Sequence, residues 1–445
     1  MMKTSFLLSA WTLFAAQSFA YYVLDTDFFT VDTNGSFFDK FNFINETDPT
    51  HGTVSYRNYS DCRDLNLIQN TTENIIMRVD STNALSGDDG RPSVRIESKK
   101  KFYKGLIVVD VDHMPASICG VWPAFWTYGP DWPKNGEIDI IEGINQFQAN
   151  RMTLHTAPGC YTKNQSTYSQ QYSGSLLYTN CTAGTGCSIG TLETNTYGDG
   201  FNAIGGGIYA TEWTEKYISI YFFPRDLCEQ NDIIAGPLGK NPDPSTWGIP
   251  LSRFDLTCNI ERNFRNHSIV FDTTFCGDWA DGANQWNSTI PVNTTWPPYA
   301  TTNSGSWLQS GKKHGFGPYF ASNSTCAAKT GMICKDWVKK RPEAFKEAYW
   351  SVNALRVYQE YDGLSSYADA PGSLLDVDVE VDVDLSLGSG EDEQQDEHDQ
   401  RQEEQGNQQQ EEDPSSLLDR EASPHDEPEA PKHGHFGHHK HKHRH

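Results

Sequence analysis

The feature that most constrains the fold is a series of short runs, rich in β-branched and aromatic residues, that are separated by glycine, proline and asparagine. The runs are Ser93–Ser98, Gly105–Met114, Glu137–Ile144, Met152–Ala157, Gly206–Trp213, Tyr217–Phe223, His267–Phe275 and Asn353–Tyr361. This recurrence is typical of strands and predicts an all-β sandwich or barrel. The clearest helix signal covers Arg341–Trp350, because Pro342 stands near its first turn.

One run carries an unusual concentration of charge. The stretch NGEIDIIEGIN contains Glu137, Asp139 and Glu142 among isoleucines, and a turn-like GPDWPKNG precedes its strand. Alternate residues of a strand share a face, so Glu137 and Asp139 point the same way, whereas Glu142 would point to the opposite side. A β-bulge near Ile140–Ile141 restores the parity. We therefore predict that the three carboxylates line one face while the isoleucines turn toward the core.

Carboxylates that lie this close together cannot all ionise readily, so we expect one raised pKa and one that stays low. A protonated acid and an ionised nucleophile are the two groups that a glycosidase needs. An exposed acidic strand and a Ca²⁺ site remain as alternatives.

Aromatic residues precede the acids, and they would either stack on sugar rings or pack in the core: Trp122, Phe125, Trp126, Tyr128 and Trp132. With few cationic residues nearby, they favour a polysaccharide over phosphate or nucleic acid as the ligand.

The N-terminus predicts secretion. Residues 1–20 combine Lys3, the apolar run Phe6–Phe19 and a small-residue cleavage site after Ala20, as a signal peptide does. This run is too short for a membrane span, and no other stretch is long and apolar enough to cross a bilayer. Ten cysteines and many Asn-x-Ser/Thr sequons agree with a disulfide-bonded glycoprotein outside the cell or in the cell wall. Only two local disulfides suggest themselves, Cys181/Cys187 and Cys326/Cys334.

The composition changes near Tyr361, which divides the chain into two parts. We expect one all-β domain over residues 21–363 and a disordered acidic tail over residues 364–445, since the tail has few aromatic residues and a high net charge. Its end, HGHFGHHKHKHRH, could bind Zn²⁺, Cu²⁺ or Ni²⁺. A low-complexity terminus that becomes cationic in mild acid is the simpler interpretation.

The motif GEIDIIEG, with WPAFW upstream, resembles the signature of glycoside hydrolase family 16, in its fungal laminarinase or endo-1,3(4)-β-glucanase group. The resemblance extends in order through GRPSVRIESK, DVDHMPASICGVWPAFWTYGPDWP, TLHT, YGDGFNAIGGGIYATEW, FDTTFCGDWA and AFKEAYWSVNALRVYQ. The resemblance covers most of residues 21–359. The tail has no counterpart in it. The resemblance implies a β-jelly-roll sandwich of two antiparallel sheets, the concave one carrying a substrate cleft.

The same resemblance assigns catalytic roles. Glu137 matches the nucleophile and Glu142 the acid/base, while Asp139 matches the carboxylate that tunes protonation between them. His155, in TLHT, matches a histidine on the neighbouring strand, although a structural histidine is the alternative.

Substrate-binding residues also follow from the resemblance and the aromatic cluster. Arg95, Trp132 and Trp279 match subsite residues. The aromatic residues Trp122, Phe125 and Trp126 complete the predicted set, with Phe125 at a position where some relatives carry Trp.

Three functions remain open: an endo-β-glucanase that cuts β-1,3 or mixed β-1,3/1,4 glucans with retention, a cell-wall glucan transglycosylase, and a non-catalytic β-glucan-binding protein. The presence of both glutamates argues against the third. The expected partner is a β-glucan polysaccharide. We expect no cofactor, no resident metal, no nucleic acid and a monomer.

Overall fold

The computed structural model describes residues 21–33, 35–71, 73–163, 171–225, 238–287 and 325–361. The predicted signal peptide and the acidic tail lie outside these residues, so nothing below bears on them. Within the described part of the chain, no helix has the length and apolar character needed to span a membrane.

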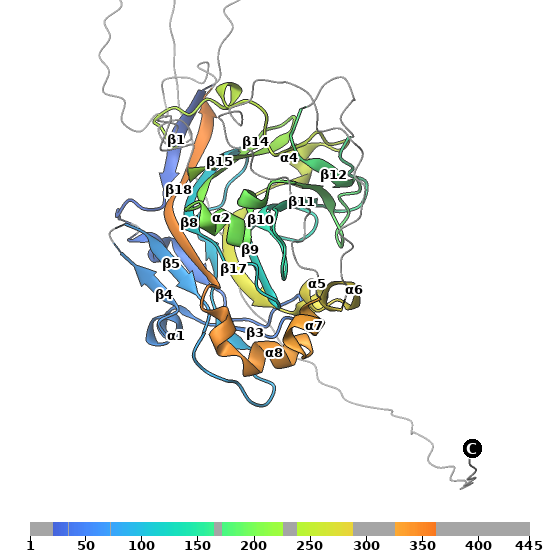
Figure 1. Cartoon of the computed structure of the whole chain (residues 1–445). Helices are drawn as coiled ribbons and strands as arrows, with labels where there is room; N and C mark the ends of the chain where they lie inside the picture. The colour runs from blue at the N-terminus through green and yellow to red at the C-terminus, as the bar shows by residue number, and fades with distance from the viewer. Residues whose placement is uncertain are drawn as a thin grey trace, which may run out of the picture. The chain divides into compact units, whose positions relative to one another are not determined.

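Two eight-stranded sheets contain all but two of the strands in the described chain, and every strand pair within them is antiparallel (Figure 1). The β18 sheet runs in the order β16 (Ser252–Phe254), β15 (Ile218–Pro224), β14 (Gly207–Trp213), β8 (Gly105–His113), β18 (Tyr349–Tyr361), β5 (Ile75–Arg78) and β4 (Ile68–Asn70), with β1 (Tyr21–Asp27) beside β18. The β10 sheet runs in the order β12 (Ser175–Tyr178), β13 (Cys187–Gly190), β11 (Arg151–His155), β10 (Glu137–Glu142), β9 (Val121–Tyr128), β17 (Ser268–Phe275), β7 (Arg95–Ser98) and β2 (Phe41–Phe43).

The remaining elements are short. Strands β3 (Val54–Tyr56) and β6 (Arg91–Ser93) form a parallel pair. The α-helices are α1 (Tyr59–Asp64), α2 (Gly198–Ala203), α4 (Ile260–Asn263), α5 (Gly277–Ala280), α6 (Ala283–Trp286), α7 (Cys326–Thr330) and α8 (Cys334–Lys340). The 3-10 turns are η1 (Phe37–Lys40), η2 (Thr194–Thr196), η4 (Pro244–Thr246) and η5 (Pro342–Phe345).

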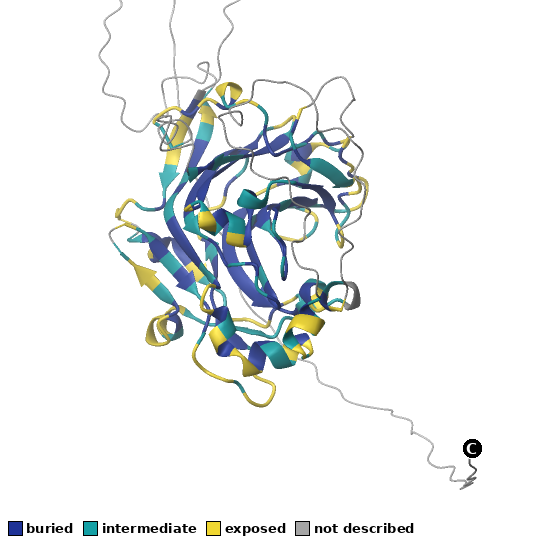
Figure 2. Ribbon diagram, in the orientation of Figure 1, coloured by how far each residue is buried: buried dark blue, intermediate teal, exposed yellow. Residues whose placement is uncertain are grey.

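The main core lies between the two sheets, as the buried strand interiors in Figure 2 show. Ile138, Ile140 and Ile141 of β10 share this cluster with Val109 of β8 and Val357 of β18. Each fully buried isoleucine contributes about 1.5–3 kcal/mol relative to an exposed one. The isoleucines of the acidic run therefore hold β10 against the β18 sheet and leave its other face for polar residues.

All eight predicted strand runs contain strands, and the prediction of an all-β fold with two antiparallel sheets is confirmed. The helix predicted over Arg341–Trp350 is wrong. Only the single turn η5 forms there, and Tyr349 and Trp350 already pair with β5. Trp350 is buried and its indole N–H donates to the Asp272 carbonyl at 3.1 Å, so packing between the sheets overrides local helix propensity.

Four disulfides are present among the described cysteines. The predicted bond Cys181–Cys187 is confirmed. The predicted bond Cys326/Cys334 is wrong, because each pairs with a distant cysteine in the smaller core where α7 and α8 pack: Cys119–Cys326 and Cys276–Cys334. The fourth bond is Cys160–Cys258, and Cys62 is buried with a free thiol. The α7–α8 segment is thus joined to the ends of β9 and β17.

Candidate active site

The predicted β-bulge in β10 is confirmed by its pairing with β9. Asp139 lies opposite Trp126 and Ile141 lies opposite Phe125, so Ile140 is an extra residue with no partner of its own. Glu142 lies opposite Ala124. The extra residue returns Glu142 to the face that carries Glu137 and Asp139, as the isoleucine-rich sequence requires.

Glu137, Asp139 and Glu142 line one cleft of about 830 Å³ on the β10 sheet. Of the predicted site residues, nine line it: Arg95, Trp122, Trp126, Trp132, Glu137, Asp139, Glu142, His155 and Trp279. The fold therefore brings together, in one place, residues that are up to 184 positions apart in the chain, from Arg95 to Trp279 (279 − 95).

Phe125 is the exception, and its prediction as a substrate-binding residue is wrong. Its side chain is fully buried between the sheets, with its ring centroid 4.5 Å from that of Phe271. Trp122, Ala124 and Trp126 face the cleft, so the intervening Phe125 must face the core.

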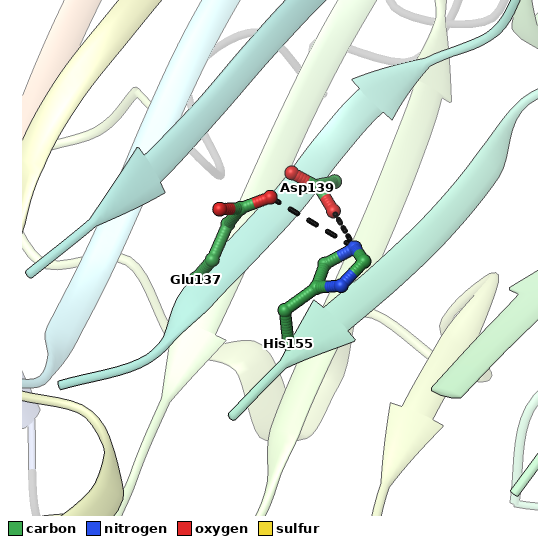
Figure 3. A group of neighbouring side chains, drawn as sticks. All are labelled: Glu137, Asp139 and His155. Carbon is green, nitrogen blue, oxygen red and sulfur yellow. Dashed lines mark ion pairs between the residues drawn. The ribbon is translucent and has the colours of Figure 1, made fainter. Parts of the chain in front are cut away.

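His155 reaches the acids from the adjacent strand β11, where it lies directly opposite Glu137 (Figure 3). Its Nε2 atom is 3.3 Å from Asp139 Oδ2 and 3.8 Å from Glu137 Oε1. One ligand atom from each of these three residues lies within 4.8 Å of the others, so the group could also hold a divalent cation. Two carboxylates suffice for glycoside hydrolysis without one.

Burial dominates the protonation of the three acids. It raises the pKa of Glu137 well above the usual range, and the charge of Asp139 raises it further. Burial and then the charge of Glu142 do the same for the pKa of Asp139, which is hydrogen-bonded to Glu137. We expected one raised and one low pKa, but the pKa of all three is raised, because none is exposed enough for water to solvate its charge.

Glu142 differs from the other two acids because burial raises its pKa without a contribution from a neighbouring carboxylate. Burial raises its pKa, but the Trp122 indole N–H donates to Glu142 Oε1 at 2.9 Å and favours the charged carboxylate. The charges of His155 and Arg151 act in the same direction. The Trp132 indole N–H donates to Glu137 Oε2, so each glutamate is oriented by its own tryptophan.

Polar residues hold the aromatic side chains Trp126 and Tyr128 of the cleft in place. Trp126 stacks on Tyr128, with ring centroids 5.1 Å apart, and the Arg95 guanidinium lies 5.1 Å from the Trp126 centroid. Glu97 connects these residues, since it accepts from Arg95 Nη2 at 2.8 Å and from the Tyr128 hydroxyl at 2.9 Å. Trp279 meets Trp122 edge to face at 5.5 Å.

Sequence reasoning missed four charged residues of the cleft, namely Asp48, Arg151, Asp272 and Asp278, of which Asp272 and Arg151 lie on strands of the β10 sheet. Asp272 of β17 lies opposite both Ala124 and Arg95, so it shares a cross-strand row with Glu142. Burial raises the pKa of Asp272 to about 7 although Arg95 Nη1 is 3.9 Å away. The sequence could have indicated Asp272, because it is the single acid in the otherwise uncharged run IVFDTTF.

Arg151 is the second of these strand residues. Its guanidinium lies 5.2 Å from the Trp279 ring centroid and 5.3 Å from that of Tyr178, and it bonds the Ser188 hydroxyl. The sequence could have indicated Arg151, because alternate residues of a strand share a face. Arg151, Thr153 and His155 alternate along β11, and all three line the cleft.

Comparison with known proteins agrees with this geometry. Residues 41–310 match the model of the XgeA-like, catalytic GH16 domain. An endo-1,3(4)-beta-glucanase of Arthroderma benhamiae is 37% identical over 350 residues, which are 77% of this chain and 65% of that protein. The chain spans about half to two thirds of the length of the curated relatives it matches.

Two solved structures are similar over 76% of this chain and 100% of their own, each with 34% identity. One is GH16 Laminarinase 16A from Phanerochaete chrysosporium, described with 6-O-glucosyl-laminaritriose in donor and acceptor sites, at a TM-score of 0.62. The other is described as an elongating GH family 16 beta-1,3-glucosyltransferase, at a TM-score of 0.58.

Proposed function

The chain belongs to glycoside hydrolase family 16, and on that premise we propose that it is an endo-β-glucanase that hydrolyses internal β-1,3 or mixed β-1,3/1,4 glucosidic bonds with retention. The observation that carries the proposal is the bulged strand β10, which turns Glu137 and Glu142 into one aromatic-lined cleft. The endo-1,3(4)-beta-glucanase names of its relatives and the laminarinase similarity support the choice of substrate.

The reaction has two displacement steps. In the first, a Glu137 carboxylate oxygen attacks the anomeric carbon while Glu142 gives its proton to the departing glycosidic oxygen. The C–O bond breaks with its electron pair on that oxygen, and a glycosyl ester of Glu137 forms. In the second, Glu142 takes a proton from water, the water oxygen attacks the same carbon, and Glu137 leaves as a carboxylate. Two inversions give net retention.

The neighbouring groups manage protons during this cycle. Asp139 is hydrogen-bonded to Glu137, and His155 Nε2 lies 3.3 Å from Asp139, so a proton can be held away from the attacking oxygen. Glu142 needs a raised pKa to be protonated before the first step, which its burial supplies. A sugar bound over the cleft would exclude further water and strengthen these interactions.

Binding is assigned to the remaining cleft residues. Trp122, Trp132 and Trp279 offer apolar ring surface to sugar C–H groups. Arg95 and Asp272 offer a donor and an acceptor for hydroxyl groups in the row that contains Glu142. The row passes through Ala124, whose small side chain leaves space above the strand.

The direct test is Glu137→Gln, which removes the nucleophilic carboxylate and keeps its shape. We expect release of reducing ends from laminarin and lichenan to stop while binding of the glucan persists, with cellulose as a comparison substrate. Cleavage by this variant at the wild-type rate would show that the role is misassigned. Glu142→Ala should reduce turnover of polymeric glucan by about 10²–10⁴-fold. A β-glycosyl azide formed on adding azide would identify Glu142 as the acid/base.

Transglycosylation is the second candidate, and the similarity to a β-1,3-glucosyltransferase favours keeping it. In that reaction a sugar hydroxyl replaces water in the second step, with the same residues. Redistribution of glucan chain lengths without a matching rise in reducing ends would identify it. A purely binding role fits poorly with two glutamates in one cleft.

The domain assignment is part of the same proposal. We assign catalysis to residues 21–363, with residues 1–20 as the signal that directs secretion. The four disulfides fit an oxidising compartment.

A further inference from the structure

The bulge that turns Glu142 into the cleft leaves a gap in the hydrogen-bond ladder on one side of β10. Toward β9, pairing continues from Glu137 through to Glu142. Toward β11, pairing stops at Asp139, which lies opposite Thr153. The backbone groups that follow Asp139 on this side therefore need partners other than a neighbouring strand.

One side chain supplies both partners. Asn150, immediately before β11, accepts a hydrogen bond from the Glu142 backbone N–H through Oδ1 at 3.0 Å. Its Nδ2 group donates to the Ile140 carbonyl at 2.7 Å. A single amide thus links the extra residue, Ile140, to Glu142 across Ile141, and Asn150 is fully buried.

The backbone of Asn150 is also held by hydrogen bonds. The Asn150 backbone N–H donates to Thr196 Oγ1 at 3.1 Å, and its carbonyl accepts from the Thr191 N–H at 3.0 Å. The hydroxyls of Thr191 and Thr196 are 2.8 Å apart, and the Tyr209 hydroxyl of β14 donates to the Thr196 carbonyl at 2.6 Å. The bridge is therefore tied into the β18 sheet.

We propose that Asn150 is a positioning residue for catalysis: its side-chain amide closes the bulge and sets the direction of the Glu142 carboxyl. This inference rests on the proposed acid/base role of Glu142. Asn150 contacts the backbone of the bulge, and it acts through Glu142. Removing the amide leaves a buried N–H and a buried carbonyl without partners, so the bulge must rearrange to satisfy them.

A matched pair of variants separates positioning from simple structural support. Asn202 makes the same two-point bond elsewhere, accepting from the Met114 N–H at 3.0 Å and donating to the Met114 carbonyl at 2.9 Å. It does not line the cleft. We expect both Asn150→Ala and Asn202→Ala to lower Tm, the first by more because Asn150 is fully buried and Asn202 is half-buried. Only Asn150→Ala should lower kcat on laminarin, by about 10²-fold, as expected for a misplaced catalytic group.

A substrate with a good leaving group locates the defect at Glu142. Dinitrophenyl β-laminaribioside needs little protonation of its leaving group, so the first step on it should tolerate Asn150→Ala far better than laminarin does. Azide should then accelerate turnover of the aryl glycoside by Asn150→Ala, as it should for Glu142→Ala. A general loss of structure would lower both substrates equally and would not respond to azide.

Asn150→Asp tests the hydrogen-bond pattern directly, and it decides the matter if the alanine variant does not fold. A protonated Asp still offers an O–H donor for Ile140 and a carbonyl acceptor for Glu142, whereas an ionised one lacks the donor. We expect laminarin hydrolysis close to wild type at low pH and a steep loss as the pH rises. Activity equal to wild type at every pH would overturn the inference.

These measurements separate failure of the proposed hydrolase function from failure of the positioning role of Asn150. If the wild-type protein releases no reducing ends from any β-glucan, the proposed function fails and Asn150 is not at issue. If the wild type is active and Asn150→Ala matches Asn202→Ala on both substrates, the function stands and the positioning role is overturned.

Discussion

At the residue scale, a tryptophan beside each glutamate donates a hydrogen bond that favours the ionised carboxylate over the protonated acid. The Trp122 N–H stabilises the Glu142 carboxylate, and its bond lowers a pKa that burial otherwise raises. Trp132 makes the equivalent bond to Glu137. The two indoles therefore act on opposite flanks of the activity profile, because one glutamate must be protonated and the other ionised.

We predict that Trp122→Phe moves the alkaline limb of the kcat/KM profile to higher pH. Loss of the N–H raises the pKa of Glu142, so the acid stays protonated at a pH where the wild type has lost its proton. The measurement is kcat/KM on a soluble β-glucan across the pH range. Trp132→Phe is the matched control and should move the acidic limb upward instead. An alkaline limb that stays in place in Trp122→Phe would contradict the assignment of Glu142.

Sequence reasoning found most of the site because the three acids and three tryptophans lie in one stretch, Trp122–Glu142, and the family resemblance supplied Arg95, His155 and Trp279. It failed for Phe125, since adjacent aromatic residues differ only in strand parity, and parity depends on which face a strand buries. It missed Arg151 and Asp272 because they lie on β11 and β17, and the place of these strands in the sheet depends on pairing that the sequence does not show. Raised pKa values for all three acids also could not be read in advance, because burial is a property of the assembled cleft.

At the element scale, strand β10 depends on the exact number of residues between its acids. Ile140 is the extra residue of the bulge, and Ile138 is an ordinary alternating residue that faces the core. Removing Ile140 leaves a regular strand in which Glu142 still shares the face of Asp139. Removing Ile138 places Glu137 next to Asp139 and turns it toward the core.

We predict that deletion of Ile138 abolishes hydrolysis as fully as Glu137→Gln, whereas deletion of Ile140 leaves measurable activity. Deletion of Ile140 removes one buried isoleucine and should cost about 2–5 kcal/mol, as for large-to-small core changes, whereas deletion of Ile138 should cost more because it also turns a carboxyl group toward the core. Circular dichroism and urea unfolding establish folding before glucan hydrolysis is measured. Equal inactivity of two folded variants would mean that parity does not determine which acids reach the cleft.

The strands were predictable because each is short, punctuated by turn residues and apolar in the expected pattern. The segment Arg341–Trp350 was not, because its last two residues belong to β18 and are held by β5 and by the carbonyl of Asp272. Those partners lie at least 78 residues away in the chain. Local helix or strand propensity cannot predict contacts with partners so distant in the chain.

At the scale of the whole molecule, disulfides close loops of very different length. Cys119–Cys326 spans 207 residues and joins α7 to the start of β9, while Cys181–Cys187 spans 6. The chain-entropy model makes the first worth roughly 5 kcal/mol and the second roughly 2 kcal/mol. The pairing of Cys119 with Cys326 does not follow from sequence, because it depends on how α7 and α8 pack against the ends of the β10 sheet, whereas the short Cys181–Cys187 loop was predicted from its spacing.

We predict that Cys119→Ser/Cys326→Ser lowers the free energy of unfolding by more than Cys181→Ser/Cys187→Ser does. Urea unfolding at constant pH measures both, and treating the wild type with a reductant gives the combined loss. A larger loss for the short loop would show that native packing around Cys181 outweighs chain entropy.

The setting of Trp126 has a consequence for the thermodynamics of sugar recognition. Tyr128, Glu97 and Arg95 hold its ring within the protein's own framework, so its rotamer is chosen during folding. A glucan chain then binds against a preordered Trp126 ring, and little side-chain conformational entropy remains to be lost on association. Calorimetry across temperature should accordingly resemble that of a rigid receptor, with a heat-capacity change that tracks the apolar area covered.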